Sequence, residues 1–394
     1  MNVPLLDLGP QIKALRSEIL QAVTDVIDST RYILGPEVVS FEEKLAAYCQ
    51  SDFGVGVSSG TDALVMTLMS LGVGAGDFVI TTPYTFFATM GAILRVGAQP
   101  IFVDIEEESF NMDPEALERV LMMQSQQEGG IKAIIPVHLF GQCADMNRIM
   151  PLAEKYAVPV VEDAAQAIGA CCPLTDADGT VHWKKAGSMG IAGCFSFFPS
   201  KNLGGIGDGG MVTTGDEDFV EILRSCRNHG AQPKYYHARV GGNFRIDPIQ
   251  AVVLAIKLRH LEDWHGKRRE NSQTYRTLFK DAGLLHSPVE LPHEQFATVP
   301  GAENHKHHIY NQFVIRVPDR DGLRTFLQDQ SIGTEVYYPL CLHQQECVRE
   351  YNGRKFPVAE KAAQESLALP IYPELSKEQI SFVVEMITKF YTSG

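Results

Sequence analysis

Apolar residues recur at helical spacing near the start of the chain and at strand-like spacing beyond it. The first set predicts an amphipathic helix over residues 11–28, and Pro36 suits the first turn of a second helix that runs to Tyr48. From residue 54, short β-type runs alternate with helix-length segments. The expected strands are 54–58, 78–81, 100–104, 132–137 and 158–162, and the expected helices between them are 61–71, 85–96, 114–123 and 146–156. Repeated β-α-β units of this length predict a mostly parallel sheet with helices on both faces.

The second half of the chain departs from this rhythm. We expect an exposed turn or hairpin at 176–185, strands at 194–198 and 211–214, a helix at 216–227 and a long helix from 247 to about 276. The C-terminal part predicts a strand at 310–317, a helix at 321–330, a strand at 334–338 and a final helix at 377–391. The sequence therefore predicts an α/β fold with a large domain over residues 1–250 and a smaller C-terminal α/β domain over 251–394, entered through the long helix.

The composition and net charge argue against several classes of protein and binding partner. The 394 residues are 45% hydrophobic and 21% charged, and the net charge of −14 argues against binding to DNA, RNA or anionic membranes. No apolar run is long enough for a transmembrane helix, and the first residues lack the pattern of a signal peptide, so we expect a cytoplasmic protein. The eight cysteines are scattered without C-x-x-C pairs, which predicts reduced thiols.

Lys201 lies between an apolar run that ends at Phe198 and a loop with five glycines from Gly204 to Gly210. The pattern predicts a strand, a glycine-rich turn that carries Lys201, and a second strand. A solvated loop lysine is the commoner interpretation of such a residue. At the mouth of an apolar pocket, however, a lysine loses hydration, which lowers its pKa and frees the amine to condense with an aldehyde. The glycines also fit G-x-G-x-x-G, but the strand that follows them excludes dinucleotide binding through this loop.

Further motifs follow predicted strands, at the edge of the sheet where ligands gather. Gly60 and Thr61 open a helix and suit an anion, although an ordinary helix N-cap is the commoner explanation. Asp163 follows a buried strand and suits the protonated nitrogen of a heterocycle, with a helix N-cap as the equal alternative. Gln166 lies one helical turn further on and faces the same way.

An aromatic ring and a hydroxyl complete this predicted site. The stretch Thr82–Thr89 places an aromatic ring at the rim, and Ser196 precedes Lys201 by five residues. The combined features are a phosphate cup, a stacking ring, a carboxylate for a ring nitrogen and an amine for an aldehyde. Pyridoxal 5'-phosphate (PLP) is the cofactor that uses all four.

The motifs that carry these residues resemble a known family. The matching stretches are 32–38, 59–64, 85–89, 103–105, 136–142, 162–166, 196–201, 242–247 and 336–339. In this order, and over nearly the whole chain, they are similar to the DegT/StrS family of nucleotide-sugar aminotransferases, within the aspartate aminotransferase (type I) fold. The resemblance implies that Lys201 forms the Schiff base with PLP and then moves the proton. Asp163 pairs with the pyridinium nitrogen, Gln166 approaches the ring hydroxyl, and Phe86 stacks on the ring.

The resemblance also implies a shared site. Gly60, Thr61 and Ser196 bind the cofactor phosphate, and Asn243 reaches it from the partner subunit, so a homodimer is expected. The residues that match substrate positions are Arg245, His308, Tyr310 and Tyr338. Three histidines at 305–308 invite a metal interpretation, but adjacent residues on a strand point to opposite faces, and we predict no metal site.

The resemblance implies transfer of an amino group from an amino acid, usually L-glutamate, to a nucleoside-diphosphate-linked keto sugar. The motif set favours amination of a 3-keto hexose, for the synthesis of a surface polysaccharide, another glycan or an antibiotic. Amination at C4 is one alternative. A PLP-dependent sugar dehydratase is another, although that branch of the family replaces the lysine with histidine, whereas Lys201 is present here. A noncatalytic regulatory protein on the same scaffold is the third.

Overall fold

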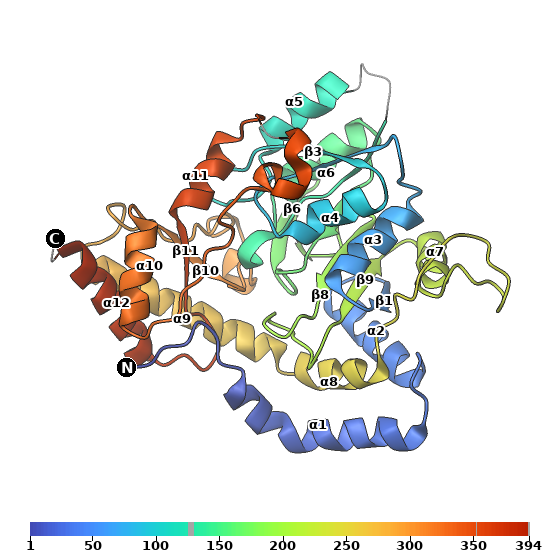
Figure 1. Cartoon of the computed structure of the whole chain (residues 1–394), viewed down its shortest axis with the longest axis horizontal. Coiled ribbons are helices and arrows are strands. Elements are labelled where there is room, and N and C mark those ends of the chain that lie inside the picture. The colour runs from blue at the N-terminus through green and yellow to red at the C-terminus, as the bar shows by residue number, and fades with distance from the viewer. Residues whose placement is uncertain (125–129, 352, 393–394) are drawn as a thin grey trace.

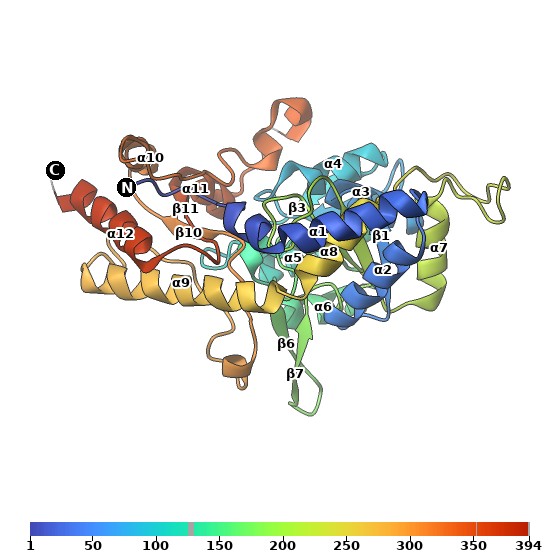
Figure 2. The ribbon, with the colours of Figure 1, turned by 90° about the horizontal axis from the view of Figure 1, so that it is seen from below.

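The computed structural model describes residues 1–124, 130–351 and 353–392 (Figure 1). A central sheet lies between helices, and long helices link it to a second group of elements at the C-terminal end (Figures 1 and 2). The strands of the central sheet are β1 (Phe53–Val57), β2 (Phe78–Thr81), β3 (Gln99–Phe102), β4 (Ile131–Ile134), β5 (Val161–Asp163), β8 (Ala192–Ser196) and β9 (Gly210–Thr214).

These strands form two ladders, of order β3-β2-β4 and β5-β8-β9-β1. Parallel bridges from Ile134 to Val160 and from Val137 to Asp163 join the two ladders. Strand β9 runs antiparallel to both β8 and β1, and the pairs β2-β3, β2-β4 and β5-β8 are parallel. The mostly parallel sheet predicted from the β-α-β rhythm is therefore confirmed. The exception arises because a short glycine loop, rather than a crossover helix, connects β8 to β9.

The helices of the first part of the chain cover this sheet. They are α1 (Gly9–Ser29), α2 (Pro36–Tyr48), α3 (Gly60–Ser70), α4 (Phe87–Arg95), α5 (Pro114–Gln124), α6 (Met146–Lys155), α7 (Glu217–Arg227) and α8 (Pro248–Leu258). All of them lie within a few residues of their predicted positions. The predicted hairpin is confirmed as β6 (Cys171–Thr175) and β7 (Val181–Lys185), which project from the body in Figure 2.

The predicted long helix is wrong in one respect, because it is two helices. Helix α8 ends at Leu258, and α9 (Leu261–Asp281) begins after Arg259 and His260. Helix α8 packs its apolar side chains, including Val253 and Leu254, into the large core beneath α1 and α2, whereas the second half of α9 contributes Tyr275 and Phe279 to another core. The break redirects the chain from one core to the other.

The second core gathers the C-terminal elements. They are β10 (Phe313–Arg316), α10 (Arg320–Asp329), β11 (Ser366–Leu369) and α12 (Lys377–Thr392). Helix α11 (Pro357–Glu365) instead packs its buried alanines into a separate cluster with Tyr84 and Val137. Helix α11 and strand β11 have no counterpart among the predictions. The strand predicted at 334–338 is wrong, because β11 pairs with β10 and the 334–338 segment makes a single bridge, from Glu335 to Ala368. Its tyrosines instead line a cavity at the strand ends of the central sheet.

The N-terminus ties the two parts together. Val3 lies in the second core, forms a parallel bridge with Ile332, and accepts a hydrogen bond from the Gly333 amide at 2.8 Å. Helix α1 then runs back along α8 toward the large core (Figure 1). Within the described ranges, no helix combines the length and apolarity needed to cross a membrane.

Candidate active site

A cavity of about 360 Å³ lies at the carboxyl ends of the strands of the central sheet. Its walls come from the segments that follow β1, β2, β5 and β8, together with tyrosines from the C-terminal part. The structure brings eight of the predicted residues to this one cavity. They are Gly60, Thr61, Phe86, Asp163, Gln166, Ser196, Lys201 and Tyr338.

Lys201 is partly buried in the loop between β8 and β9. Its amide donates to the Phe198 carbonyl at 2.8 Å, which fixes the turn after Pro199. A Cβ on Gly204 would lie 2.2 Å from the Pro199 carbonyl oxygen, so only glycine allows the loop to fold back this tightly. Burial lowers the pKa of the Lys201 amine to about 8, against the opposing effect of the Asp163 carboxylate. The predicted shift toward a free amine is therefore present.

Helix α8 supports this loop from beneath. The Lys257 ammonium, which is 2% exposed, donates to the carbonyl oxygen of Gly204. The Gln250 side chain accepts a hydrogen bond from the Ile206 amide at 2.9 Å. Burial also lowers the pKa of Lys257 to about 8. Both side chains reach the loop from a helix about fifty residues further along the chain, and no pattern in the sequence identified them.

Asp163 ends β5 and is 5% exposed. Its Oδ2 accepts a hydrogen bond from the Thr89 hydroxyl at 2.8 Å, and its Oδ1 accepts one from the Ala165 amide at 3.3 Å. Burial raises the pKa of Asp163, whereas these hydrogen bonds and the Lys201 charge lower it. Thr89 lies in a matching motif but was assigned no role from sequence. Its partner Asp163 lies 74 positions further along the chain, so no local spacing identifies the contact.

The residue before Asp163 anchors the strand end. Glu162 is fully buried and accepts backbone hydrogen bonds from Gly187, Met189 and Gly190 at 2.7 to 2.8 Å. Its Oε2 also lies 2.8 Å from His138 Nε2. Because His138 Nδ1 accepts from a backbone amide, at Ala144, the Nε2 atom carries the proton and donates to Glu162. This network fixes the backbone from which Asp163 projects.

The start of α3 forms a cup for an anion. The Ser59 hydroxyl caps the helix by accepting from the Asp62 amide at 3.0 Å. The first N–H groups of a helix have no intrahelical partner, and those of Gly60 and Thr61 lie at the cavity. A Cβ on Gly60 would lie 2.6 Å from Cβ of Ser196, so glycine allows this helix to approach the Ser196 hydroxyl. The predicted phosphate ligands thus converge.

An aromatic face remains uncovered at the cavity. The Phe86 side chain is 59% exposed although it is a large apolar group, and its ring centroid lies 6.3 Å from that of Tyr338. Gln166 donates from Nε2 to the Tyr338 hydroxyl at 2.9 Å and accepts at Oε1 from the Phe140 amide at 2.7 Å. These bonds fix the orientation of its amide and leave one N–H of Nε2 for a ligand.

Four predicted residues lie away from this cavity within one chain. Asn243 is exposed and pairs in a bridge with Asn228, and Arg245 donates to the Asn228 side chain at 2.6 Å. His308 and Tyr310 are buried and stacked, with ring centroids 3.9 Å apart. Their roles in substrate binding stay predictions.

The histidines at 305–308 have other partners. His305 stacks on Trp183 with ring centroids 4.7 Å apart, and His307 lies 3.6 Å from a carboxylate oxygen of Glu294. Across the parts of the chain that the structure describes, no group of three or more histidine, cysteine or acidic side chains is arranged to hold a metal ion.

The donor set fits PLP. An anion cup, a free aromatic face, a buried carboxylate and an amine of lowered pKa line one cavity, in the arrangement that a phosphorylated pyridine aldehyde requires. The Asp163 carboxylate has no cationic partner within ion-pairing distance among the described residues, which suits it to the protonated nitrogen of a ring.

Comparisons with known proteins agree with this geometry. The model of the DegT/DnrJ/EryC1/StrS aminotransferase family matches residues 13–388. The chain is 44% identical over 395 residues to a pleiotropic regulatory protein of Geobacillus stearothermophilus, with 99% of each chain covered. It is 39% identical over 387 residues to UDP-N-acetyl-3-dehydro-α-D-glucosamine 3-aminotransferase of Acidithiobacillus ferrooxidans, covering 98% of this chain and 97% of that one.

A solved structure shows the same fold. NtdA from Bacillus subtilis, with bound cofactor PMP, aligns with a TM-score of 0.85 at 29% sequence identity. The alignment covers 98% of this chain and 85% of that chain. The fold predicted from sequence is confirmed by this likeness.

Proposed function

Because this chain belongs to the DegT/DnrJ/EryC1/StrS aminotransferase family, we propose that it aminates a nucleoside-diphosphate-linked keto sugar, with an amino acid as the amino donor. One observation carries the proposal: Lys201, with its lowered pKa, lies in the same cavity as the buried Asp163. The relative from Acidithiobacillus supports a 3-keto sugar as the acceptor. We propose L-glutamate as the amino donor.

The predicted cofactor is supported by the aminotransferase family and by the PMP of the NtdA structure. When bound, PLP supplies an aldehyde that accepts an amine and a ring that takes up the electrons of a carbanion. Gly60, Thr61 and Ser196 hold the phosphate, and Phe86 covers one face of the ring. Asp163 holds a proton on the ring nitrogen, which favours electron uptake by the ring.

Lys201 has two tasks in this reaction. Its Nζ would hold PLP through the aldehyde, and burial favours the neutral amine that this requires. Once released, Nζ would move a proton between Cα of the amino donor and the cofactor. The glycine loop and Lys257 keep the amine at the cavity while it performs both steps. Gln166 directs its remaining N–H toward the ring hydroxyl.

We also propose that the active site is completed by a second copy of the chain. The segment 228–246 carries Lys234, Arg239 and Arg245 and contains no acidic residue, on a chain with a net charge of −14. After α7 this segment stands out from the body in both views, and Tyr235 and Tyr236 on it are 80% and 71% exposed (Figures 1 and 2). Its charge suits the phosphates of a cofactor and of a nucleotide sugar.

Mixed dimers test the shared site. Co-expressed Lys201→Ala and Asn243→Ala subunits, each with its own affinity tag, form a dimer in which one site keeps both native residues if Asn243 acts across the interface. Activity should then reappear in the mixed dimer although both parent variants are impaired. A mixed dimer no more active than its parents would contradict the shared site.

We also propose where the chain works and how it divides into domains. The chain works in the cytoplasm, and residues 1–250 and 251–394 form its two domains. Two of the core clusters support the division, although α8 crosses that border and packs into the first core.

Spectroscopy before and after addition of L-glutamate tests the proposed function. The purified protein loaded with PLP should absorb in the visible, and the band should move toward the near ultraviolet with the donor alone. UDP- and dTDP-linked 3-keto and 4-keto sugars are then added in turn. The sugars of one class should accept the amino group and restore the visible band. Lys201→Ala should lose the initial band while keeping its fold. A flat spectrum from the native protein after loading would overturn the proposal.

A noncatalytic regulatory role is the second candidate, because the relative from Geobacillus is named a pleiotropic regulatory protein. The same experiment separates the two. A regulatory scaffold without turnover would show no spectral response to any amino donor. A sugar dehydratase is disfavoured by the presence of Lys201 in the cavity.

A further inference from the structure

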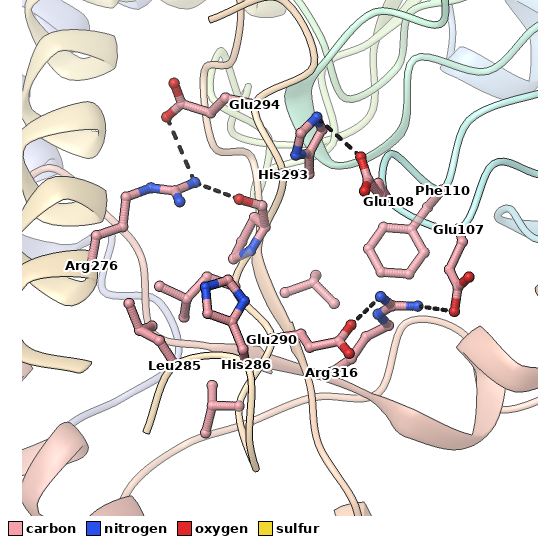
Figure 3. Close-up of a pocket in the computed structure, with 14 residues that line it drawn as sticks. Glu107, Glu108, Phe110, Arg276, Leu285, His286, Glu290, His293, Glu294 and Arg316 are labelled. Carbon is pink, nitrogen blue, oxygen red and sulfur yellow. Dashed lines mark hydrogen bonds and ion pairs between the residues drawn. The ribbon is translucent and has the colours of Figure 1, made fainter. Parts of the chain in front are cut away.

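A second cavity, of about 620 Å³, lies apart from the active site (Figure 3). Its walls come from residues 107–110, from α9, from the segment 285–294 and from β10. None of its lining residues lines the active-site cavity. Because its walls come from both, the cavity lies between the large part of the chain and the C-terminal part. Ligand sites often occupy such a position.

The two arginines of this cavity are already engaged. Arg316 is 13% exposed, contacts Glu107 at 3.3 Å and Glu290 more closely, and lies 5.8 Å from the centre of the Phe110 ring. Arg276 donates to the Pro292 carbonyl and to the Tyr310 hydroxyl and lies 3.8 Å from Glu294 (Figure 3). Both positive charges thus have carboxylate partners in the walls.

The carboxylates are more accessible than the arginines. The Glu290 side chain is 47% exposed and that of Glu108 is 71% exposed. Glu108 has His293 as its ion-pair partner, at 3.4 Å, so it lacks a permanent cation. Glu107 differs, because Lys361 contacts it from outside the cavity at 2.8 Å. Glu290 uses Oε2 for its ion pair with Arg316, so its Oε1 and the Glu108 carboxylate are the acceptors that a cationic ligand meets.

The remaining walls are apolar. Phe110, Val289, Leu291 and Val314 line the cavity between the charged groups. An inorganic cation would leave this surface uncovered, whereas a carbon chain would bury it. The volume, the covered arginines, the accessible carboxylates and the apolar walls together describe a ligand that combines ammonium groups with methylene segments.

We propose that this cavity binds a small linear polyamine, with its ammonium groups at Glu108 and Glu290 and its methylenes against Phe110, Leu291 and Val314. The ion pairs that hold both arginines hold the walls in place before the ligand arrives. This site goes beyond the proposed aminotransferase function and does not depend on it.

Calorimetric titration of the PLP-loaded, full-length protein with spermidine tests the proposal. At low ionic strength we expect saturable binding with one spermidine per chain. Triethylene glycol, a neutral molecule of similar length, and glutarate, an anion, should give no binding. The double variant Glu108→Gln/Glu290→Gln should bind spermidine roughly three- to tenfold more weakly, the loss typical of two partly exposed charge contacts. Glu43→Gln, at an exposed site on α2, should bind as the native protein does.

A second variant separates the cavity from general attraction to an acidic protein. Leu291→Trp places a bulkier side chain in the apolar wall and keeps every carboxylate, so it should weaken spermidine binding. Circular dichroism and the PLP absorbance check that each variant is folded. Three results would overturn the proposal: no saturable binding to the native protein, unchanged affinity in the double variant, or unchanged affinity in Leu291→Trp.

Discussion

The Thr89 hydroxyl donates a 2.8 Å hydrogen bond to Oδ2 of Asp163, joining the first turns of α4 to the end of β5. Thr89 is fully buried, and its oxygen lies 3.3 Å from the Thr85 hydroxyl. Because Thr89 gives its proton to Asp163, Thr85 is the donor to Thr89, and the two hydroxyls form a chain that ends on the carboxylate. Burial raises the pKa of Asp163 and this bond opposes the rise.

Replacing Thr89 with valine should therefore weaken the ionised form of Asp163. A hydrogen bond to a charged group contributes about 1.5–3 kcal/mol, so kcat should fall roughly 10- to 100-fold. The pKa of Asp163 rises further in the variant, so the deficit should be largest at low pH and shrink as pH increases. A pH series of kcat for native, Thr89→Val and Thr89→Ser proteins measures this. Thr89→Ser keeps the hydroxyl and should stay close to native; an equal deficit at every pH would contradict the assignment.

The sequence was sufficient to predict the cavity because its residues are adjacent to strand ends. Asp163 follows β5, Gly60 follows β1, and Lys201 follows β8, and the carboxyl ends of parallel strands meet at one edge. Local sequence patterns identify all three residues. Thr89 depends on the packing of α4 against β5, and a contact between residues 74 positions apart leaves no local pattern.

The lowered pKa of Lys201 predicts that this lysine destabilises the cofactor-free protein. Below about pH 8 it is charged in the folded and unfolded chains alike, and the burial penalty is complete. Between about pH 8 and 10.5 the folded chain releases the proton while the unfolded chain keeps it, so the penalty declines. Discounted for partial exposure, the penalty is on the order of 2 kcal/mol at pH 7.

Lys201→Met should accordingly raise the free energy of unfolding of the apoprotein at pH 7, and the gain should diminish toward pH 10.5. Urea unfolding of both proteins across this range measures the difference. Lys280→Met, at an exposed position on α9, is the matched control and should change little. A gain that is absent at pH 7, or constant with pH, would show that the amine is not desolvated.

Lys257 is predicted to position Lys201 through the backbone of the glycine loop. Lys257→Met removes the donor to the Gly204 carbonyl and leaves the shape of the side chain nearly unchanged. An unpaired buried carbonyl costs about 1–3 kcal/mol, so the loop should open more often. We expect PLP to dissociate roughly tenfold faster, measured by transfer of PLP to an acceptor apoenzyme. Lys257→Gln retains a hydrogen-bond donor, so its rate of PLP release should lie between those of the native protein and Lys257→Met. Equal rates of release from the native and Lys257→Met proteins would contradict a positioning role for Lys257.

Long-range packing also explains the predictions that failed. The sequence predicts one helix because a charge-rich stretch continues the apolar segment of α8. The break at Arg259 and His260 accompanies a change of core, since Val253 and Tyr275 belong to different cores. The 334–338 segment has the composition of a strand, but the Tyr337 carbonyl accepts from the Tyr84 hydroxyl and Tyr338 bonds Gln166. Those partners come from the other part of the chain, and strand propensity does not encode them.

His265 on α9 is predicted to make the protein acid-sensitive. It is fully buried, and neither ring nitrogen has a hydrogen-bond partner among the described residues. Burial lowers the pKa of His265 to about 3; the Glu262 charge opposes this, and the charges of Arg268, Lys306 and Lys185 add to it. The ordinary pKa of the unfolded chain is 6.5, so stability is unaffected above that pH. As pH falls from 6.5 toward 3, the unfolded chain binds a proton that the folded chain excludes, and stability declines.

The variant His265→Leu removes this linkage. Each unit of pH below 6.5 contributes about 1.4 kcal/mol. The free energy of unfolding of the variant, relative to that of the native protein, should therefore be about 2 kcal/mol higher at pH 5 than at pH 7. Urea unfolding of both proteins at the two pH values gives the comparison, with the exposed His237→Leu as the matched control that should show no such change. The same native-to-variant difference at pH 5 and pH 7 would mean that His265 takes up its proton in the folded protein. Water would then have to reach the ring, directly or after a movement of α9, although the packing around Gly169 encloses it.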